Sequence, residues 1–173
     1  CDYCPYKAYY GFLRKRSSDS VIKELEYLKN KFNIKAVQFR DPIFTADKNR
    51  VLDIAQKIIE RKMNIEWGCE THLSYLDKDL IDVLYKSGLR AMGVGIESAD
   101  INVLENVHRS SACLDMQKEM IKYCHKKGIN ISTFYILGLP KDTKQGIENT
   151  IKYAQKLNTL VAQFMICTPF PGT

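Results

Sequence analysis

The chain has 173 residues, of which 45% are hydrophobic and 27% charged, and its formal net charge is +6 at pH 7. This length suits one globular domain that buries about two-thirds of its unfolded surface. No run of about 18 uncharged apolar residues occurs, so we expect no membrane span and no signal peptide. The lysines lie mostly on predicted helices without long basic runs, which favours solvated helix faces over nucleic-acid binding.

The six cysteines are too few for a disulfide scaffold, and without a secretory signal they indicate a reducing cytoplasm. The sequence begins at Cys1 and ends at Thr173, directly after a Pro-Gly pair. We therefore expect an internal fragment of a longer cytoplasmic protein.

The predicted elements begin with an aromatic and basic segment, Tyr6–Arg16, which we expect to be a loop. Short β-rich runs then alternate with amphipathic helices at about 30 residues per unit, the length of a βαβ element. The five strand candidates are Ile34–Phe39, Asn64–Gly68, Arg90–Ile96, Ile129–Leu137 and Leu160–Ile166. The third and the fifth are largely apolar, which predicts that helices cover them.

Apolar residues at helical spacing predict a helix between successive strands and one before the first. The marker residues of the first four helices are Val21, Leu25, Leu28 and Phe32, then Val51, Ile54 and Ile58, then Leu76, Leu80 and Leu84, and finally Cys113, Met116, Met120, Tyr123 and Cys124. Gly88 and Gly128 end the third and the fourth. In the fifth, Asp142 and Gln145 form the expected capping pair, and Ile147, Ile151 and Ala154 the buried face.

Right-handed βα units in series build either a doubly wound sheet or a barrel. In both, functional residues lie at the carboxyl ends of the strands. No linker or low-complexity tract interrupts the series, so we expect one domain.

The segment Cys1-Asp2-Tyr3-Cys4 is the first chemical motif of the chain. Taken alone, Cys-x-x-Cys fits two ligands of an iron–sulfur cluster, half of a zinc site, or a pair of thiols that holds no metal. The other four cysteines lie far apart in the sequence, so no second close pair is available for a four-cysteine zinc site.

Four further motifs follow the predicted strands, and each ends or follows a different strand. They are Phe39-Arg40-Asp41-Pro42-Ile43-Phe44-Thr45, Gly95-Ile96-Glu97-Ser98, Ile136-Leu137-Gly138-Leu139-Pro140 and Thr168-Pro169-Phe170-Pro171-Gly172-Thr173. With the Cys-x-aromatic-Cys pair, and in this order, they resemble the radical S-adenosylmethionine (SAM) superfamily over essentially the whole chain. The final motif resembles members that carry an upstream cobalamin-binding domain.

The resemblance implies an α/β fold, a partial (βα)6 TIM-like barrel with its first strand missing, parallel strands and outer helices. Residues 1–173 would form one core domain, with a cluster loop at 1–16 and βα units at 17–173. Cys1 and Cys4 would be the second and third ligands of a 4Fe–4S cluster, the first cysteine lying four residues upstream.

The same resemblance assigns SAM-binding roles. Tyr3 would pack near the adenine, Asp41 would orient the amino group, and Glu97 would face the ribose or the methionyl end. Ile136 and Gly138 belong to the turn that contacts the adenine. Residue chemistry adds two candidates: Arg109 for the SAM carboxylate and Ser132 for the ribose.

Each assignment has a structural alternative. Asp41 precedes a proline and suits a plain turn, Glu97 suits a cap for a helix that starts near Asp100, and Arg109 suits an exposed loop. His72 stands where related sequences often carry arginine, so both a SAM or substrate contact and a structural histidine remain open. We expect the remaining thiols to be buried: Cys69, Cys113, Cys124 and Cys167.

The resemblance implies an enzyme that reductively cleaves SAM to a 5′-deoxyadenosyl radical, which takes a hydrogen atom from a small-molecule substrate of unknown class. Its cofactors would be the 4Fe–4S cluster and SAM, with cobalamin from an upstream domain, and its electron donor a flavodoxin or ferredoxin. The alternative from another class is a non-catalytic βα barrel that binds zinc or a small ligand.

Overall fold

The structure is a computed structural model, and it describes residues 1–11, 14–110 and 112–173. A sheet of five parallel strands runs through the molecule, and neighbouring strands follow one another in chain order. The strands are β1 (Ala36–Gln38), β2 (Glu66–Thr71), β3 (Leu89–Glu97), β4 (Asn130–Leu137) and β5 (Val161–Ile166). The five strand predictions are confirmed, with shifted ends. The largest shift is at the end of β2, which runs on to Thr71 instead of Gly68, and β2 begins later than expected because Asn64 has a left-handed backbone with a φ of 48°.

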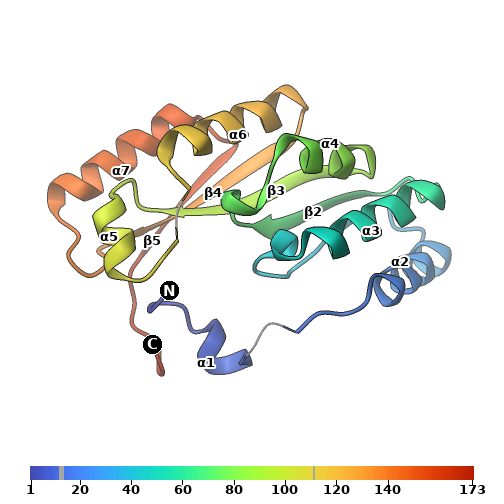
Figure 1. Cartoon of the computed structure of the whole chain (residues 1–173), viewed down its shortest axis with the longest axis horizontal. Helices are drawn as coiled ribbons and strands as arrows, with labels where there is room; N and C mark the ends of the chain where they lie inside the picture. Colours follow the sequence, from blue (N-terminus) through green and yellow to red (C-terminus); the bar gives the residue numbers. More distant parts are fainter. Residues whose placement is uncertain (12–13, 111) are drawn as a thin grey trace.

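Helices cover one face of the curled sheet, and the N-terminal segment lies on its other side (Figure 1). The helices are α1 (Tyr6–Tyr10), α2 (Ser18–Phe32), α3 (Lys48–Glu60), α4 (Lys78–Lys86), α5 (Ile101–Asn106), α6 (Leu114–Lys126) and α7 (Lys144–Leu157), with 3₁₀ turns at Phe44–Ala46 and Leu73–Tyr75. Within the described ranges, no helix combines the length and the apolar character that crossing a membrane requires.

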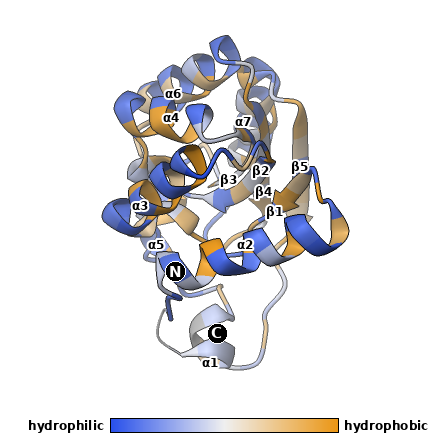
Figure 2. Cartoon of the chain, turned by 90° about the vertical axis from the view of Figure 1, so that its right-hand side faces the viewer, coloured by the Kyte–Doolittle hydropathy of each residue, from blue (hydrophilic) through white to orange (hydrophobic). Residues whose placement is uncertain are grey.

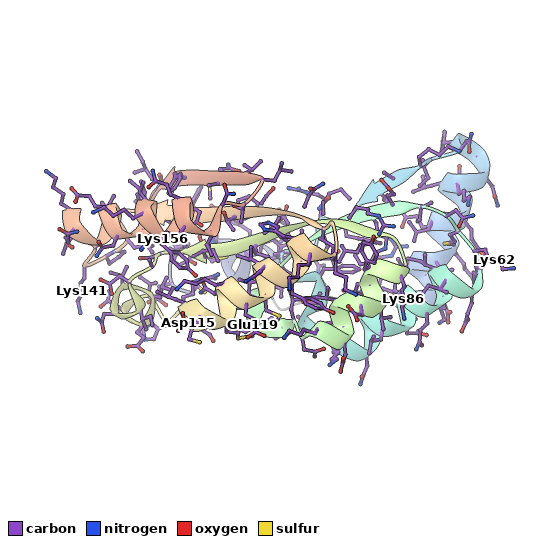
Figure 3. All side chains as sticks on the ribbon, turned by 90° about the horizontal axis from the view of Figure 1, so that it is seen from above. Lys62, Lys86, Asp115, Glu119, Lys141 and Lys156 are labelled. Carbon is purple, nitrogen blue, oxygen red and sulfur yellow. The ribbon has the colours of Figure 1, made fainter. Side chains whose placement is uncertain are left out.

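The outer layer is continuous, because α2 packs on α3, α3 on α4, and α4 on α6. Hydrophilic residues cover the outer sides of these helices and hydrophobic residues face the sheet (Figure 2). Lysines and acids such as Lys86, Glu119 and Lys156 point outward from this layer (Figure 3). The positive net charge is therefore spread over solvated helix faces, as the sequence predicts.

Side chains alternate between the two faces of the sheet, as the pleat of a strand requires. In β3, Met92, Val94 and Ile96 are buried in the main core, whereas Gly93 and Gly95 are half-buried on the opposite face. On that opposite face the side chains of Phe134 and Glu70 lie against Gly93, and that of Gln38 against Gly68. The predicted incomplete βα barrel, with parallel strands and outer helices, is thus confirmed.

Several local predictions are wrong. Tyr6–Tyr10 forms a short helix rather than a loop. All residues of β5 are exposed, because β5 is the last strand of the described sheet and has no neighbour beyond its free edge. Phe32, the last residue of α2, and Ile151, which was expected on the buried face of its helix, are also exposed, at 59% and 37% of their surface.

The start of α7 also differs from the prediction. Thr143, not Asp142, is the N-cap, and its side chain accepts a hydrogen bond from the Gly146 N–H. The Asp142 carboxylate instead accepts hydrogen bonds from the Gly138 and Thr143 N–H groups at 3.0 and 2.9 Å. Asp142 therefore shapes the turn after β4 rather than capping the helix.

Candidate functional site

Glu97 ends β3 with a left-handed backbone, at a φ of 66°, and its side chain is buried. Its Oε1 lies 3.4 Å from Nη2 of Arg109, and both side chains are 12% exposed. The cap of α5 is Asp100, so Glu97 is not the helix cap that was its structural alternative. Burial raises the pKa of Glu97, and the Arg109 guanidinium opposes that shift. The carboxylate and the guanidinium form a buried ion pair at the carboxyl end of β3.

Gly95 makes room for this pair. A Cβ atom at Gly95 would collide with the Glu97 carboxylate and lie 3.0 Å from Nη2 of Arg109. Arg109 also donates from Nη2 to the Gly95 carbonyl oxygen at 2.7 Å. The glycine and the acid of the Gly-x-Glu-Ser motif are thus linked, because the space left by the missing side chain of Gly95 is occupied by the Glu97 carboxylate and the Arg109 guanidinium.

The N-terminal loop docks beside this pair, although it is about one hundred residues away in the sequence. The Asp2 N–H donates to the Val107 carbonyl oxygen at 3.0 Å. Nδ1 of His108 lies 2.8 Å from the Asp2 carboxylate, and Nη1 of Arg109 lies 4.0 Å from Sγ of Cys1. Cys1 therefore reaches the same end of the sheet as Glu97. Cys1 and Cys4 are both exposed free thiols.

Tyr3 anchors the loop by packing on a small hydrophobic cluster. The buried members of this cluster are Val103, Leu104, Val107 and Leu139, and its partly buried neighbours are Tyr3, Ile136 and Cys167. Burial is the largest cause of a strongly raised Tyr3 pKa, and the nearby Glu97 charge adds to it. The Tyr3 phenol is thus held between the apolar cluster and the Glu97–Arg109 pair.

A pocket of about 500 Å³ opens next to Tyr3, bounded by Asp2, Val107, Gly138 and Cys167 among others. Gly138 has a φ of 76°, and a Cβ there would meet no atom within 4 Å. The backbone is therefore bare toward the open side, which allows a flat ring to approach it closely. This size lies within the range of pockets for small molecules.

Two predicted residues lie apart from this group. Asp41 is half-buried after β1 and lines a groove of about 390 Å³ with Phe39, Arg40 and residues of α2. Burial, and after it the Asp41 charge, raises the pKa of Cys69 to about 12. Ser132 is half-buried within β4, paired in register with Gly93. Its neighbour Thr133 points the other way and hydrogen-bonds Thr159 at 2.8 Å.

His72 uses both of its ring nitrogens within the protein. Nε2 lies 3.0 Å from the Ser110 carbonyl oxygen, and Nδ1 accepts a hydrogen bond from the Ser74 N–H at 3.1 Å. Nε2 must therefore carry the proton. Burial lowers the pKa of His72, followed by the charge of Arg109, which keeps the ring neutral. These contacts support the structural alternative for His72.

The prediction of buried thiols holds for Cys69 and Cys124, which are fully enclosed. It is wrong for Cys113, which is exposed because it occupies the N-cap of α6 rather than its inner face. Cys167 is half-buried and lines the pocket beside Tyr3. In the described ranges no three His, Cys, Asp or Glu residues are grouped as metal ligands.

The site nevertheless fits a cluster with bound SAM. Two exposed thiols, Cys1 and Cys4, flank Tyr3 in the loop that reaches Arg109, and an iron–sulfur cluster is held by cysteine thiolates. Nε of Arg109 is buried and has no hydrogen-bond partner among the described residues. A buried carboxylate, a guanidinium with a free donor and a bare glycine turn suit a ligand that carries hydroxyl, charged and aromatic groups.

Sequence reasoning missed the segment that holds the loop, Val107–Ser110. Arg109 was a candidate as a ligand to SAM, but its contacts with Glu97 and Cys1 were not predicted. No local signal marks this segment, because its partners come from three distant parts of the chain.

Comparison with known proteins agrees with this geometry. The family described as the Radical SAM superfamily matches residues 1–154. An uncharacterized methyltransferase of Pyrococcus horikoshii is 31% identical over all of this chain and 38% of its own length. An anaerobic magnesium-protoporphyrin IX monomethyl ester cyclase of Rubrivivax gelatinosus is 24% identical over 99% of this chain and 31% of its own. The chain thus spans less than two-fifths of these relatives.

The fold also matches a solved structure. The radical SAM methyltransferase TsrM from Kitasatospora setae, determined with cobalamin and a [4Fe-4S] cluster bound, superimposes with a TM-score of 0.80. The match covers 88% of this chain and 31% of TsrM at 18% identity, so it establishes the fold. The family match over residues 1–154 shows that this chain belongs to the radical SAM superfamily.

Proposed function

We propose that the protein containing this chain is a radical SAM enzyme that acts on a small-molecule substrate. The 4Fe–4S cluster and SAM would supply the chemistry, one electron cleaving the sulfonium to give a 5′-deoxyadenosyl radical for hydrogen abstraction. The observation that carries the proposal is the buried Glu97–Arg109 pair, in which Arg109 reaches Cys1 and which acts on Tyr3, a residue that lines the pocket beside Gly138.

Different residues bind the cluster and the different parts of SAM. Cys1 and Cys4 bind the cluster, with a third cysteine from an upstream segment. Tyr3, Ile136 and Gly138 enclose the adenine. Glu97, with Arg109, faces the ribose or methionyl end.

Asp41 and Ser132 extend the binding surface toward β1 and the middle of β4. All residues, 1–173, would belong to one core domain in which the outer helices keep the strand ends in place.

The finer reaction we propose is methyl transfer or cyclisation with cobalamin from an upstream domain. It is supported by relatives whose names are methyltransferase and cyclase, and by the final Thr168–Thr173 motif. A flavodoxin or ferredoxin would supply the electron. The free thiols favour work in the reducing cytoplasm.

The test is anaerobic reconstitution of the protein with its upstream strand and third cysteine. We expect about four irons per protein, and release of 5′-deoxyadenosine from SAM when a strong reductant is added. A reconstituted protein that binds iron but releases no 5′-deoxyadenosine would contradict the proposal. Cobalamin retention by the full-length protein, with its upstream domain, then tests the finer reaction.

A further inference from the structure

The segment between α5 and α6, Val107–Ser110, contacts the cluster loop and the ends of two strands. The Val107 carbonyl accepts from the Asp2 N–H, and the Ser110 carbonyl lies 3.0 Å from Nε2 of His72, just after β2. Between them, Arg109 reaches the end of β3. We call Val107–Ser110 the bridge segment, because it joins parts that are distant in sequence.

Among the described residues of the bridge segment, only Arg109 has a side chain that contacts both the cluster loop, at Cys1, and the end of β3, at Glu97. Its Nη2 bonds the Gly95 carbonyl at 2.7 Å and pairs with Glu97, while its Nη1 lies 4.0 Å from Sγ of Cys1. A guanidinium is planar and its donors are fixed relative to one another. A shift of Glu97 therefore moves the donor that faces the Cys1 sulfur.

We propose that Arg109 is a positioning residue that couples the Glu97 carboxylate to the Cys1 thiolate. This inference rests on the proposed function, because it assumes that Cys1 holds the cluster. The electronic state of the cluster then depends on the ion pair at the end of β3. Glu97 then has a second effect, on the cluster, besides its contact with SAM.

The remaining contacts of the bridge segment fix its path rather than tune the cluster. His108 and Asp2 are 79% and 61% exposed, and exposed ion pairs contribute little. The Asp2 N–H also bonds the carbonyl oxygen of buried Val107, and His72 bonds the Ser110 carbonyl oxygen, so both ends of the bridge segment are held through backbone groups. Among the described residues of the bridge segment, Arg109 is the one that brings a charge next to buried Glu97.

The physical consequence concerns the reduction potential. Hydrogen bonds and positive charge near the sulfurs of an iron–sulfur cluster raise its potential. Groups that hydrogen-bond metal ligands commonly tune a metal site in this way. Replacing Arg109 by an uncharged residue should therefore lower the potential, and neutralising Glu97 should alter it by changing how Arg109 faces Cys1.

The experiment uses the reconstituted protein with its upstream strand and third cysteine. The variants are Arg109→Gln, Arg109→Lys, Glu97→Gln and the double variant of Arg109→Gln with Glu97→Gln. The potential is measured without SAM by redox titration followed by electron paramagnetic resonance, and circular dichroism checks folding. The control is Arg90→Gln, because Arg90 also bonds backbone carbonyls but lies at the opposite end of β3.

We expect Arg109→Gln to lower the potential, Arg109→Lys to lower it less, and Arg90→Gln to leave it unchanged. We also expect Glu97→Gln to change the potential in the wild-type background and to have no effect when Arg109 is already glutamine. If Glu97 acted only through its own charge, its effect would be equal in both backgrounds. SAM affinity should fall by about tenfold or more in Arg109→Gln, as for loss of a charged hydrogen bond.

The outcomes separate the two proposals. A wild-type protein that cannot cleave SAM overturns the proposed function. A wild-type protein that cleaves SAM, with equal Glu97→Gln effects in both backgrounds, overturns the coupling alone. If Arg109→Gln does not fold, the same comparison is made in the Arg109→Lys background, where a residual effect smaller than in the wild type supports the coupling and an equal one refutes it.

Discussion

The two ends of β3 each carry an arginine, and their surroundings differ sharply. At the amino end, Arg90 stacks on the Tyr85 ring and donates to the Tyr85 and Leu89 carbonyls, while exposed Glu66 lies 3.7 Å away. At the carboxyl end, Arg109 is 12% exposed and pairs with an equally buried carboxylate. One arginine is a solvated surface group, and the other is part of a buried site.

In the described part of the chain, the carboxyl end of β3 carries an energetic cost that the amino end lacks, namely a buried ion pair. Burying an ion pair removes two charges from water, and the attraction between them often fails to compensate. Glu97 also adopts a left-handed backbone, which is uncommon for a residue with a side chain. The amino end also has left-handed residues, Lys62 and Asn64, but its pocket of about 310 Å³ is lined by exposed charged groups such as Lys62 and Lys86 and not by a buried ion pair among the described residues. This cost supports our proposal that the site lies at the carboxyl end.

The largest expected effect separates the cluster thiols from the others. Cys4→Ala should abolish both iron binding and SAM cleavage, because a cluster that has lost one of three thiolates is not held. Iron content and 5′-deoxyadenosine release measure this. The matched control is Cys113→Ser, since Cys113 is also exposed but lies at the N-cap of α6. Full SAM cleavage by Cys4→Ala would show that Cys4 is not a ligand of the cluster.

The next effect compares glycines at the two ends. At the amino end, Gly88 has a φ of 110°, and an added Cβ would collide with the Ile65 carbonyl oxygen. We expect Gly88→Ala to lower the free energy of unfolding by more than about 2 kcal/mol, with SAM affinity unchanged in the protein that still folds. Urea denaturation and equilibrium binding measure the two quantities.

At the carboxyl end, Gly95→Ala should show the reverse pattern. Its Cβ would meet the flexible Glu97 and Arg109 side chains, which can move at little cost to the fold. SAM affinity should fall by about tenfold, the loss expected for one displaced charged hydrogen bond. Equal effects of the two substitutions on stability would erase the contrast between the ends.

The sheet was predictable because its signals are local. Apolar runs such as Ile129–Leu137 and helix-ending glycines such as Gly88 and Gly128 depend on neighbouring residues only. The exposure of β5 was not predictable, because it depends on what lies beside the strand rather than on its apolar letters. The five-residue helix Tyr6–Tyr10 is too short for a periodic pattern to mark it.

The site was predictable in part for the same reason. Short motifs named Glu97 and Gly138, and the structure places both at the carboxyl ends of strands, near Tyr3. The contact between Arg109 and Cys1 joins residues 108 positions apart, so no motif contains it. Tertiary structure alone brings the guanidinium between the thiol and the carboxylate.

A smaller effect concerns the acids of the site. Glu97→Ala and Asp41→Ala should each weaken SAM binding by about 1–3 kcal/mol, the range for losing a charged hydrogen-bond partner. The matched control at the amino end is Glu66→Ala, whose side chain is 67% exposed. Equilibrium binding tests affinity, and circular dichroism tests the fold. Unchanged affinity with an unaltered spectrum would return both acids to structural roles.

The smallest effect is the pH dependence of stability. Burial holds the pKa of Glu97 above its ordinary value of 4.5 in the folded chain, despite the opposing charge of Arg109. Between the ordinary pKa of the unfolded chain and the raised pKa of the folded chain, the folded state binds more protons than the unfolded state. The free energy of unfolding therefore falls as pH rises through this window. Glu97→Gln removes this dependence, and its stability relative to the wild type should therefore increase as pH rises from about 4 toward neutrality.

An acid in the outer layer should show the opposite sign. Hydrogen bonds from Lys127 and Tyr123 lower the pKa of Asp82 on α4, so its contribution to stability is present at neutral pH and lost as pH falls. Asp82→Asn should therefore lose stability relative to the wild type near pH 7 and approach it in acid. Urea denaturation of both variants across this range measures the two slopes. Parallel profiles for the wild type and Glu97→Gln would mean that the carboxyl end of β3 carries no strained charge.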